Sequence, residues 1–466
     1  MSAHLTRSSL VPTLIGVGLT VFLALHFFAP TLAITWSYAH LGRQPALPIV
    51  AGLLVVILPP LAVYFARSPG WRVAARPWSP AVVLAAVAVI AATVWVLGTQ
   101  LEVFQPAADR DFYLQAVNDP TYRITRWHLT GWTVHRLAVL LAHAPLPVRR
   151  LGPVITVAFG ANLAFGVIAL TALAGAARAL AATRGEAIAI TLLTWTTFGV
   201  LQLSSGYLDV YPAALAVLSL YLWVTLRVLR GETHPAWSLG LAAVAPFWYE
   251  GLALIAPSAL VVAWVVARRP GGRRTLGIAL AVAIAAGGVS TLPIYGAPFA
   301  WRAFVSDLIA QSAVEFGYSR TSNLIPWEYL ATATHTREVL HTLLLIDGVG
   351  MLLVLVLGPA LAREVPREPE LGFLAALVLP YLLYCVVMDP VYGAFADWDL
   401  FSYGAAVTSL FGGALFVRWG RLGSPAFAPL FGLALAANLV HLLARFHALQ
   451  FYVDWHLLES PTHWPH

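Results

Sequence analysis

Long apolar runs alternate with short polar connectors along the whole chain. A helix of about 20 apolar residues is long enough to cross the hydrocarbon core of a bilayer. Because a backbone inside lipid must pair its own polar groups, each run predicts a helix. Proline, glycine and arginine separate the runs. The predicted spans, about thirteen in all, are residues 11–33, 46–66, 80–99, 151–176, 186–204, 209–227, 237–250, 253–267, 275–293, 342–360, 371–388, 402–418 and 425–444.

Two of these spans have an alternative interpretation. Residues 237–267 could form one long helix, but Pro246 and Pro257, with Gly251 between them, favour two short ones. The run at 11–33 is not followed by a small-residue cleavage site, so we expect a retained span, with a signal anchor as the alternative. We expect residues 1–466 to form a single integral membrane domain.

The composition excludes a water-soluble domain. Hydrophobic residues make up 60% of the chain and charged residues 10%, and the mean hydropathy is +0.79, whereas a soluble domain carries about 25% charged residues. The net charge is +6, but the 27 basic residues, all arginine, are scattered between apolar runs. They form no single basic face, so we expect no nucleic-acid partner. A single cysteine, Cys385, excludes an internal disulfide and a thiolate metal cluster.

Arginine distribution predicts the orientation. Cytoplasmic connectors are enriched in arginine, and the connector with Arg67, Arg72 and Arg76 is the clearest example. The N-terminus is then cytoplasmic, and alternation puts the other arginine-containing connectors on the same side. The predicted location is the bacterial inner (plasma) membrane. Two long loops, 100–150 and 294–341, and most acidic residues fall on the extracytoplasmic side.

The first long loop mixes charges with aromatic residues. Residues 127–142 predict an interfacial helix with Leu129, Trp132, Leu137 and Leu140 on its apolar face. One interpretation is a helix that anchors at lipid headgroups, with arginines on anionic lipid. The functional interpretation is a carboxylate base beside cations that bind phosphate. The residues concerned are Asp109, Arg110, Asp111, Arg123, Arg126 and His128.

Further carboxylates occur beside the spans. Asp209, near Tyr211, and Glu250 stand in apolar surroundings, where ionisable groups are costly and therefore indicate function. Helix capping is an equal alternative for Asp209.

The second long loop, which contains Arg320 and Arg337, is rich in aromatic residues that suit an interface belt or a sugar platform. Asp397 and Asp399 lie in a short acidic loop. Paired carboxylates suit a divalent cation, but Arg110 inside the first pair would repel one. We therefore assign no residues to a metal site. A divalent cation as cofactor stays an open alternative.

Together, these segments resemble the C-type integral-membrane glycosyltransferases, which use polyprenyl-phosphate sugars as donors. Asp109 and Asp111, followed by Tyr113, are similar to the segment that carries the catalytic carboxylate of that class. The segments 206–212, 329–347 and 397–402 look like those of uncharacterised bacterial relatives. The resemblance covers most of residues 100–405. The chain departs from the class because three spans precede the acidic loop and an arginine separates the two aspartates.

The resemblance implies an all-α fold and inverting transfer of a sugar from a polyprenyl-phosphate donor to a glycan, lipid or protein acceptor on the extracytoplasmic face. Asp109 or Asp111 would be the base. A transporter or flippase is the main alternative, and a lipid-linked polymer ligase is a closer one. Membrane lipids would surround the chain in each case. The resemblance implies a substrate-binding set of Arg110, Arg123, Arg126, His128, Asp209, Tyr211, Glu250, Arg320, Arg337, Asp397 and Asp399.

Overall fold

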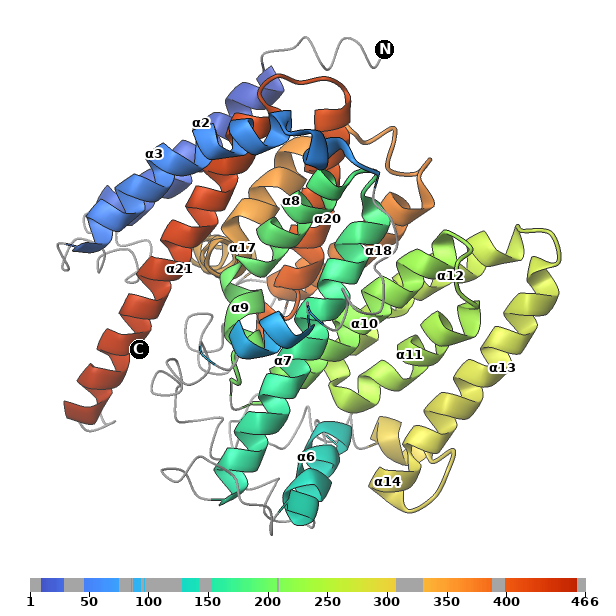
Figure 1. Cartoon of the computed structure of the whole chain (residues 1–466). Coiled ribbons are helices and arrows are strands. Elements are labelled where there is room, and N and C mark those ends of the chain that lie inside the picture. The colour runs from blue at the N-terminus through green and yellow to red at the C-terminus, as the bar shows by residue number, and fades with distance from the viewer. Residues whose placement is uncertain are drawn as a thin grey trace.

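The protein, seen in a computed structural model, is built from helices (Figure 1). No strand occurs among the described residues, where one isolated β-bridge joins Ala74 to Thr183. The expected all-α class is confirmed for this part of the chain. The structure describes residues 10–28, 46–74, 85, 87–93, 96, 128–141, 153–207, 209–306, 330–387 and 399–458.

Three groups of helices make up the body. Helices at the two ends of the chain lie side by side, because α21 packs along α3 and α2 (Figure 1, red and blue). This first group is α2 (Leu10–Phe28), α3 (Ala46–Arg67) and α21 (Phe427–Leu458). The central group is α7 (Pro153–Leu180), α8 (Arg184–Trp195), α9 (Phe198–Ser204), α10 (Tyr211–Leu229), α17 (Ala333–Ala360) and α20 (Ala405–Arg421). The third group is α11 (Pro235–Trp248), α12 (Ala256–Ala267), α13 (Gly272–Ser290) and α18 (Pro369–Val387).

Several of these helices can cross a membrane. Among the described residues, 8 helices are long and apolar enough, or up to 9 if the bent pair of α8 and α9 counts as one span. This supports a polytopic membrane protein. The remaining predicted spans include α11 and α20, which have 14 and 17 residues, and the segment 80–99, which is only partly described. A count of about thirteen therefore stays a prediction.

The helices are interrupted in two segments where the sequence predicts spans. The segment 237–267 forms two short helices as expected, because α11 ends at Trp248 and Tyr249 is extended (φ −161°, ψ 129°) before the 3₁₀ turn η6 (Glu250–Ile255). The expected span 186–204 is broken instead, because α8 and α9 meet at 76°.

Helix α17 begins earlier than its apolar run, at Ala333, so it takes in the last residues assigned to the second loop. The side chain of Thr332 caps this start by accepting the N–H of His335 at 3.2 Å. Hydropathy does not detect the start because the sequence ATHTREVLH is polar.

The arginine connectors meet at one end of the bundle, which we call the arginine end (residues 68–74, 178–186, 227–232, 268–274, 363–368 and 418–421). The Arg184 N–H donates to Val73 O at 2.8 Å, and Arg230 Nη1 donates to Ala179 O at 2.8 Å. Arg269 Nη1 donates to Val228 O at 2.8 Å. Alternation predicted that these connectors share a side, and the contacts agree. Which side faces the cytoplasm stays a prediction.

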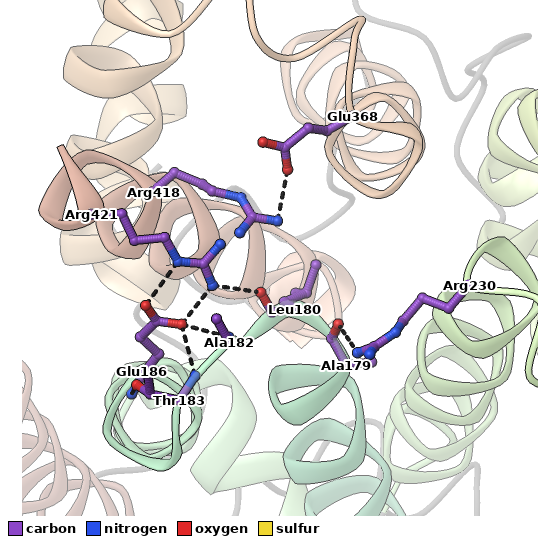
Figure 2. A network of polar contacts seen from close by, with 9 residues as sticks. All are labelled: Ala179, Leu180, Ala182, Thr183, Glu186, Arg230, Glu368, Arg418 and Arg421. Carbon is purple, nitrogen blue, oxygen red and sulfur yellow. Dashed lines mark hydrogen bonds and ion pairs between the residues drawn. The ribbon is translucent and has the colours of Figure 1, made fainter. Parts of the chain in front are cut away.

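A carboxylate clamp fastens α20 to this end (Figure 2). Arg421 binds Glu186 with two nitrogens, Nε to Oε1 at 2.8 Å and Nη2 to Oε2 at 2.5 Å. Glu186 also completes a capping box with Thr183 at the start of α8. Arg418 pairs with Glu368 at 2.6 Å. The clamp fixes the register of α8, α18 and α20 at the arginine end.

Candidate functional site

Three polar segments that the sequence marked separately come together at the far ends of α10, α11 and α20. The ring centroid of Tyr211 lies 5.4 Å from that of Tyr249, which lies 5.4 Å from that of Tyr403, and both pairs are edge-to-face. We call the group Asp209, Tyr211, Tyr249, Glu250 and Tyr403 the tyrosine junction. Because α10 has 19 residues and ends at the arginine end, the junction lies about 28 Å away from it.

The turn before α10 is held from α7. The amide nitrogen of Asn162 donates to the carbonyls of Tyr207 and, at 3.0 Å, Asp209. Asp209 is 1% exposed, and its Oδ1 accepts the N–H of Val210 at 2.6 Å. Part of the role of Asp209 is therefore to fix the turn before α10. This role resembles the helix capping that was the alternative for this residue. A Cβ on Gly166 of α7 would lie 2.0 Å from Ser204 O at the end of α9. The two helices can therefore pack this closely only because residue 166 is a glycine.

The break between α11 and η6 brings two phenols beside a carboxylate. The side chains of Tyr249 and Tyr403 are 1% and 3% exposed. Their hydroxyl groups have no hydrogen-bond partner among the described residues. Glu250, half-buried, lies within electrostatic range of both phenols. A Cβ on Gly251 would lie 2.4 Å from Tyr249 Cε1 and 2.6 Å from the Tyr403 hydroxyl oxygen, so the close packing here depends on glycine.

The junction continues into α19 (Asp399–Ser402), the short helix before α20. The Tyr381 hydroxyl on α18 donates to Phe401 O and anchors this helix. The ring of Tyr381 also lies 6.2 Å from that of Tyr403. Asp399 begins the helix that leads to Tyr403, although its side chain is not described, and Asp397 lies outside the described residues.

The helix predicted at 127–142 is present as α6 (His128–Leu141), at the bottom of Figure 1 beside α14 (Leu292–Tyr295), and its interfacial position stays a prediction. Thr130 Oγ1 donates to Trp248 O at 2.9 Å, so α6 is attached next to the junction. Of the residues expected on its apolar face, Leu129 is buried against the bundle and Trp132 is 41% exposed on the outside, and Val134 is also fully buried. Leu129, Thr130 and Val134 are buried because α6 packs on α7 and α11.

A second group of polar side chains, the basic cluster, is Arg337, His341, His441 and Arg445. The Arg445 side chain on α21 is 2% exposed, with its guanidinium 4.9 Å from the ring of Phe198 on α9. Arg445 and Arg337 are electrostatic neighbours of His341. Sequence reasoning missed His441 and Arg445, because they sit at the end of an apolar run. Their spacing of four residues, one face of a helix, was the available signal.

Asp347 is a buried carboxylate that hydropathy also missed. It lies inside the predicted span 342–360, is 1% exposed and has non-helical dihedral angles (φ −161°, ψ 60°). Oδ1 accepts the Gly350 N–H at 2.9 Å, and Oδ2 accepts the Thr408 hydroxyl. Asp347 therefore caps the second half of α17 and ties it to α20.

Helix α9 connects the junction to the basic cluster. Phe198, its first residue, contacts Arg445, and the next residue, Gly199, faces Ser402 O of α19, which a Cβ there would meet at 2.8 Å. The structure thus brings Asp209, Tyr211 and Glu250 together in one group and puts Arg337 in the other. His128 lies in α6, but its side chain is not described. The other predicted site residues lie outside the described ranges: Asp109, Arg110, Asp111, Arg123, Arg126, Arg320 and Asp397.

In the part of the chain that the structure describes, no three His, Cys, Asp or Glu side chains are grouped to hold a metal ion. No protein-family model matches the chain, and no curated protein matches it significantly. The two groups of residues around α9 are therefore the features that point to a function.

Proposed function

We propose that the protein is a membrane glycosyltransferase that moves a sugar from a polyprenyl-phosphate donor to an acceptor at the junction end of the bundle. The observation that carries the proposal is the arrangement around α9, with a basic cluster on one side and a junction of carboxylates and phenols on the other. A phosphorylated sugar presents the matching pair of chemistries, an anion and a ring with hydroxyl groups.

The donor phosphate belongs at the basic cluster in this proposal. Guanidinium groups bind phosphate oxygens through paired N–H donors, and an anion offsets the cost of a buried guanidinium. Arg445 is buried, whereas Arg337 is exposed on the first turns of α17. Arg337 would meet the donor first, and Arg445 would hold its phosphate beside Phe198.

The transfer is a single displacement at the anomeric carbon. The acceptor hydroxyl loses its proton to a carboxylate and forms the new C–O bond, and polyprenyl phosphate leaves with the electrons of the old one. Asp109 or Asp111 is the proposed base. The segment that carries them precedes α6, whose Thr130 is bonded to Trp248 next to the junction. Asp209 and Glu250 would orient the sugar hydroxyls.

Variants of the two aspartates test the proposed base. Purified protein is assayed with polyprenyl-phosphate sugars, and wild type is compared with Asp109→Asn and Asp111→Asn. Loss of the general base should slow transfer by about 10²- to 10⁴-fold in one variant. Glu232→Gln is the matched control, since Glu232 pairs with Arg230 at the arginine end. Full activity in both aspartate variants would remove the central residue of the mechanism.

A transporter is the second candidate, and specific observations favour it. Transporters use interrupted helices and carboxylates near mid-membrane. The α8 and α9 pair is bent by 76°, and Asp347 interrupts α17 in its interior. We favour the enzyme because the capping role of Asp347 and its bond with Thr408 explain that carboxylate structurally.

A further inference from the structure

The hydroxyl groups of Tyr249 and Tyr403 are buried at the tyrosine junction. A buried hydroxyl without a hydrogen bond destabilises a folded protein, because it has given up its hydrogen bonds with water. Both phenols are almost fully buried, and neither hydroxyl has a hydrogen-bond partner among the described residues. Phenylalanine would fill the same space without this cost. Two such hydroxyls on packed neighbouring rings therefore point to polar groups from beyond the described residues.

The surroundings restrict what those groups are. Tyr249 and Tyr403 meet edge-to-face at 5.4 Å, and Gly251 lies close to both. Glu250 adds a carboxylate that accepts hydrogen bonds, and the phenols can donate or accept. The Tyr211 ring adds an apolar wall. The group recognised here thus has several hydroxyls on an otherwise apolar frame.

We propose that Tyr249, Glu250 and Tyr403 form a subsite for adjacent hydroxyl groups of a sugar ring. This inference rests on the proposed function, and it assigns the sugar to the break between α11 and η6. The phenol hydroxyls bind two adjacent sugar hydroxyl groups, and the Glu250 carboxylate accepts a hydrogen bond from a sugar hydroxyl. Binding supplies the two phenols with hydrogen bonds that no described residue provides.

The experiment uses the full-length protein in nanodiscs and simple methyl glycosides as probes. Saturation-transfer NMR is recorded with the methyl glycosides of glucose, mannose, galactose and arabinose. Tyr249→Phe and Tyr403→Phe each remove one hydroxyl and keep the ring. Tyr64→Phe is the matched control, because Tyr64 is 70% exposed on α3, far along the chain from the junction.

We expect at least one glycoside to bind wild type, and each junction variant to weaken that binding about three- to tenfold, as loss of a neutral hydrogen bond does. The control should bind like wild type. No binding by any glycoside, or equal binding by wild type and both junction variants, would overturn the subsite. The second result would leave bound water as the partner of the hydroxyls.

A second assay distinguishes failure of the subsite from failure of the proposed transferase function. Turnover of polyprenyl-phosphate sugars is measured on the same samples. If glycosides bind through the two tyrosines but no donor is turned over, the subsite stands and the transferase proposal falls. If donor is turned over at equal rates by wild type and both tyrosine variants, with no glycoside binding, the transferase proposal stands and the subsite falls.

Discussion

The imidazole of His26 on α2 lies 2.9 Å from that of His441 on α21, measured between Nε2 and Nδ1, although 415 residues separate them in sequence. The other nitrogen of each ring lies 2.7 Å from a carbonyl, that of Phe22 for His26 and that of Leu345 for His441. Two neutral rings carry two N–H protons, one fewer than these three contacts need. The pair links α2, α21 and the interrupted helix α17.

We expect His441→Leu to lower the free energy of unfolding by about 1–3 kcal/mol, because Leu345 O and the His26 ring each lose a buried partner. His26→Leu should have a similar effect. The double variant should lose less than the sum, because the two rings share one interaction. Unfolding in micelles, followed by circular dichroism, measures all three. Additive losses would show that the pair is not coupled.

The clamp at the arginine end predicts a graded series. Glu186→Gln keeps an oxygen for the capping box but loses the charge that binds Arg421, whereas Glu186→Ala loses both. We expect losses in the free energy of unfolding of about 1 kcal/mol for the first and about 2–3 kcal/mol for the second. Arg72→Ala, an exposed change at the same end, is the control. Equal losses for both Glu186 variants would contradict separate roles for charge and cap.

A pair of glycine substitutions tests the packing of the junction. Gly251→Ala brings a methyl group within 2.6 Å of the Tyr403 hydroxyl and should displace that side chain, whereas Gly240 on α11 has nothing within 4 Å of the added Cβ. We expect Gly251→Ala to lose stability by about 1–3 kcal/mol and to reduce donor turnover. Gly240→Ala should be neutral or slightly stabilising, because alanine favours helix. Comparable melting temperatures and turnover for the two variants would mean that the junction is loosely packed.

Sequence patterns predicted the helices better than the contacts between them. Apolar runs and prolines located most spans and the break at Tyr249, because both signals are local. They also marked Asp209, Tyr211 and Glu250, which the structure brings together. The start of α17 was missed because its first turns are polar.

The missed polar residues share one cause. His26, Asp347 and Arg445 are single polar residues within or beside apolar runs, so a window of hydropathy averages them away. Their roles depend on partners far along the chain, such as Thr408 for Asp347 and Phe198 for Arg445. No local pattern carries that information.

The central claim is that the donor is cleaved at the protein rather than carried across the membrane. The most direct test reconstitutes wild type and Glu250→Gln in proteoliposomes with a polyprenyl-phosphate sugar labelled in the sugar, and separates labelled product from intact donor over time. The account predicts that wild type releases polyprenyl phosphate and transfers the label, and that Glu250→Gln does so more slowly. Donor that stays intact while it moves between leaflets in a protein-dependent manner would contradict the account and favour the transporter.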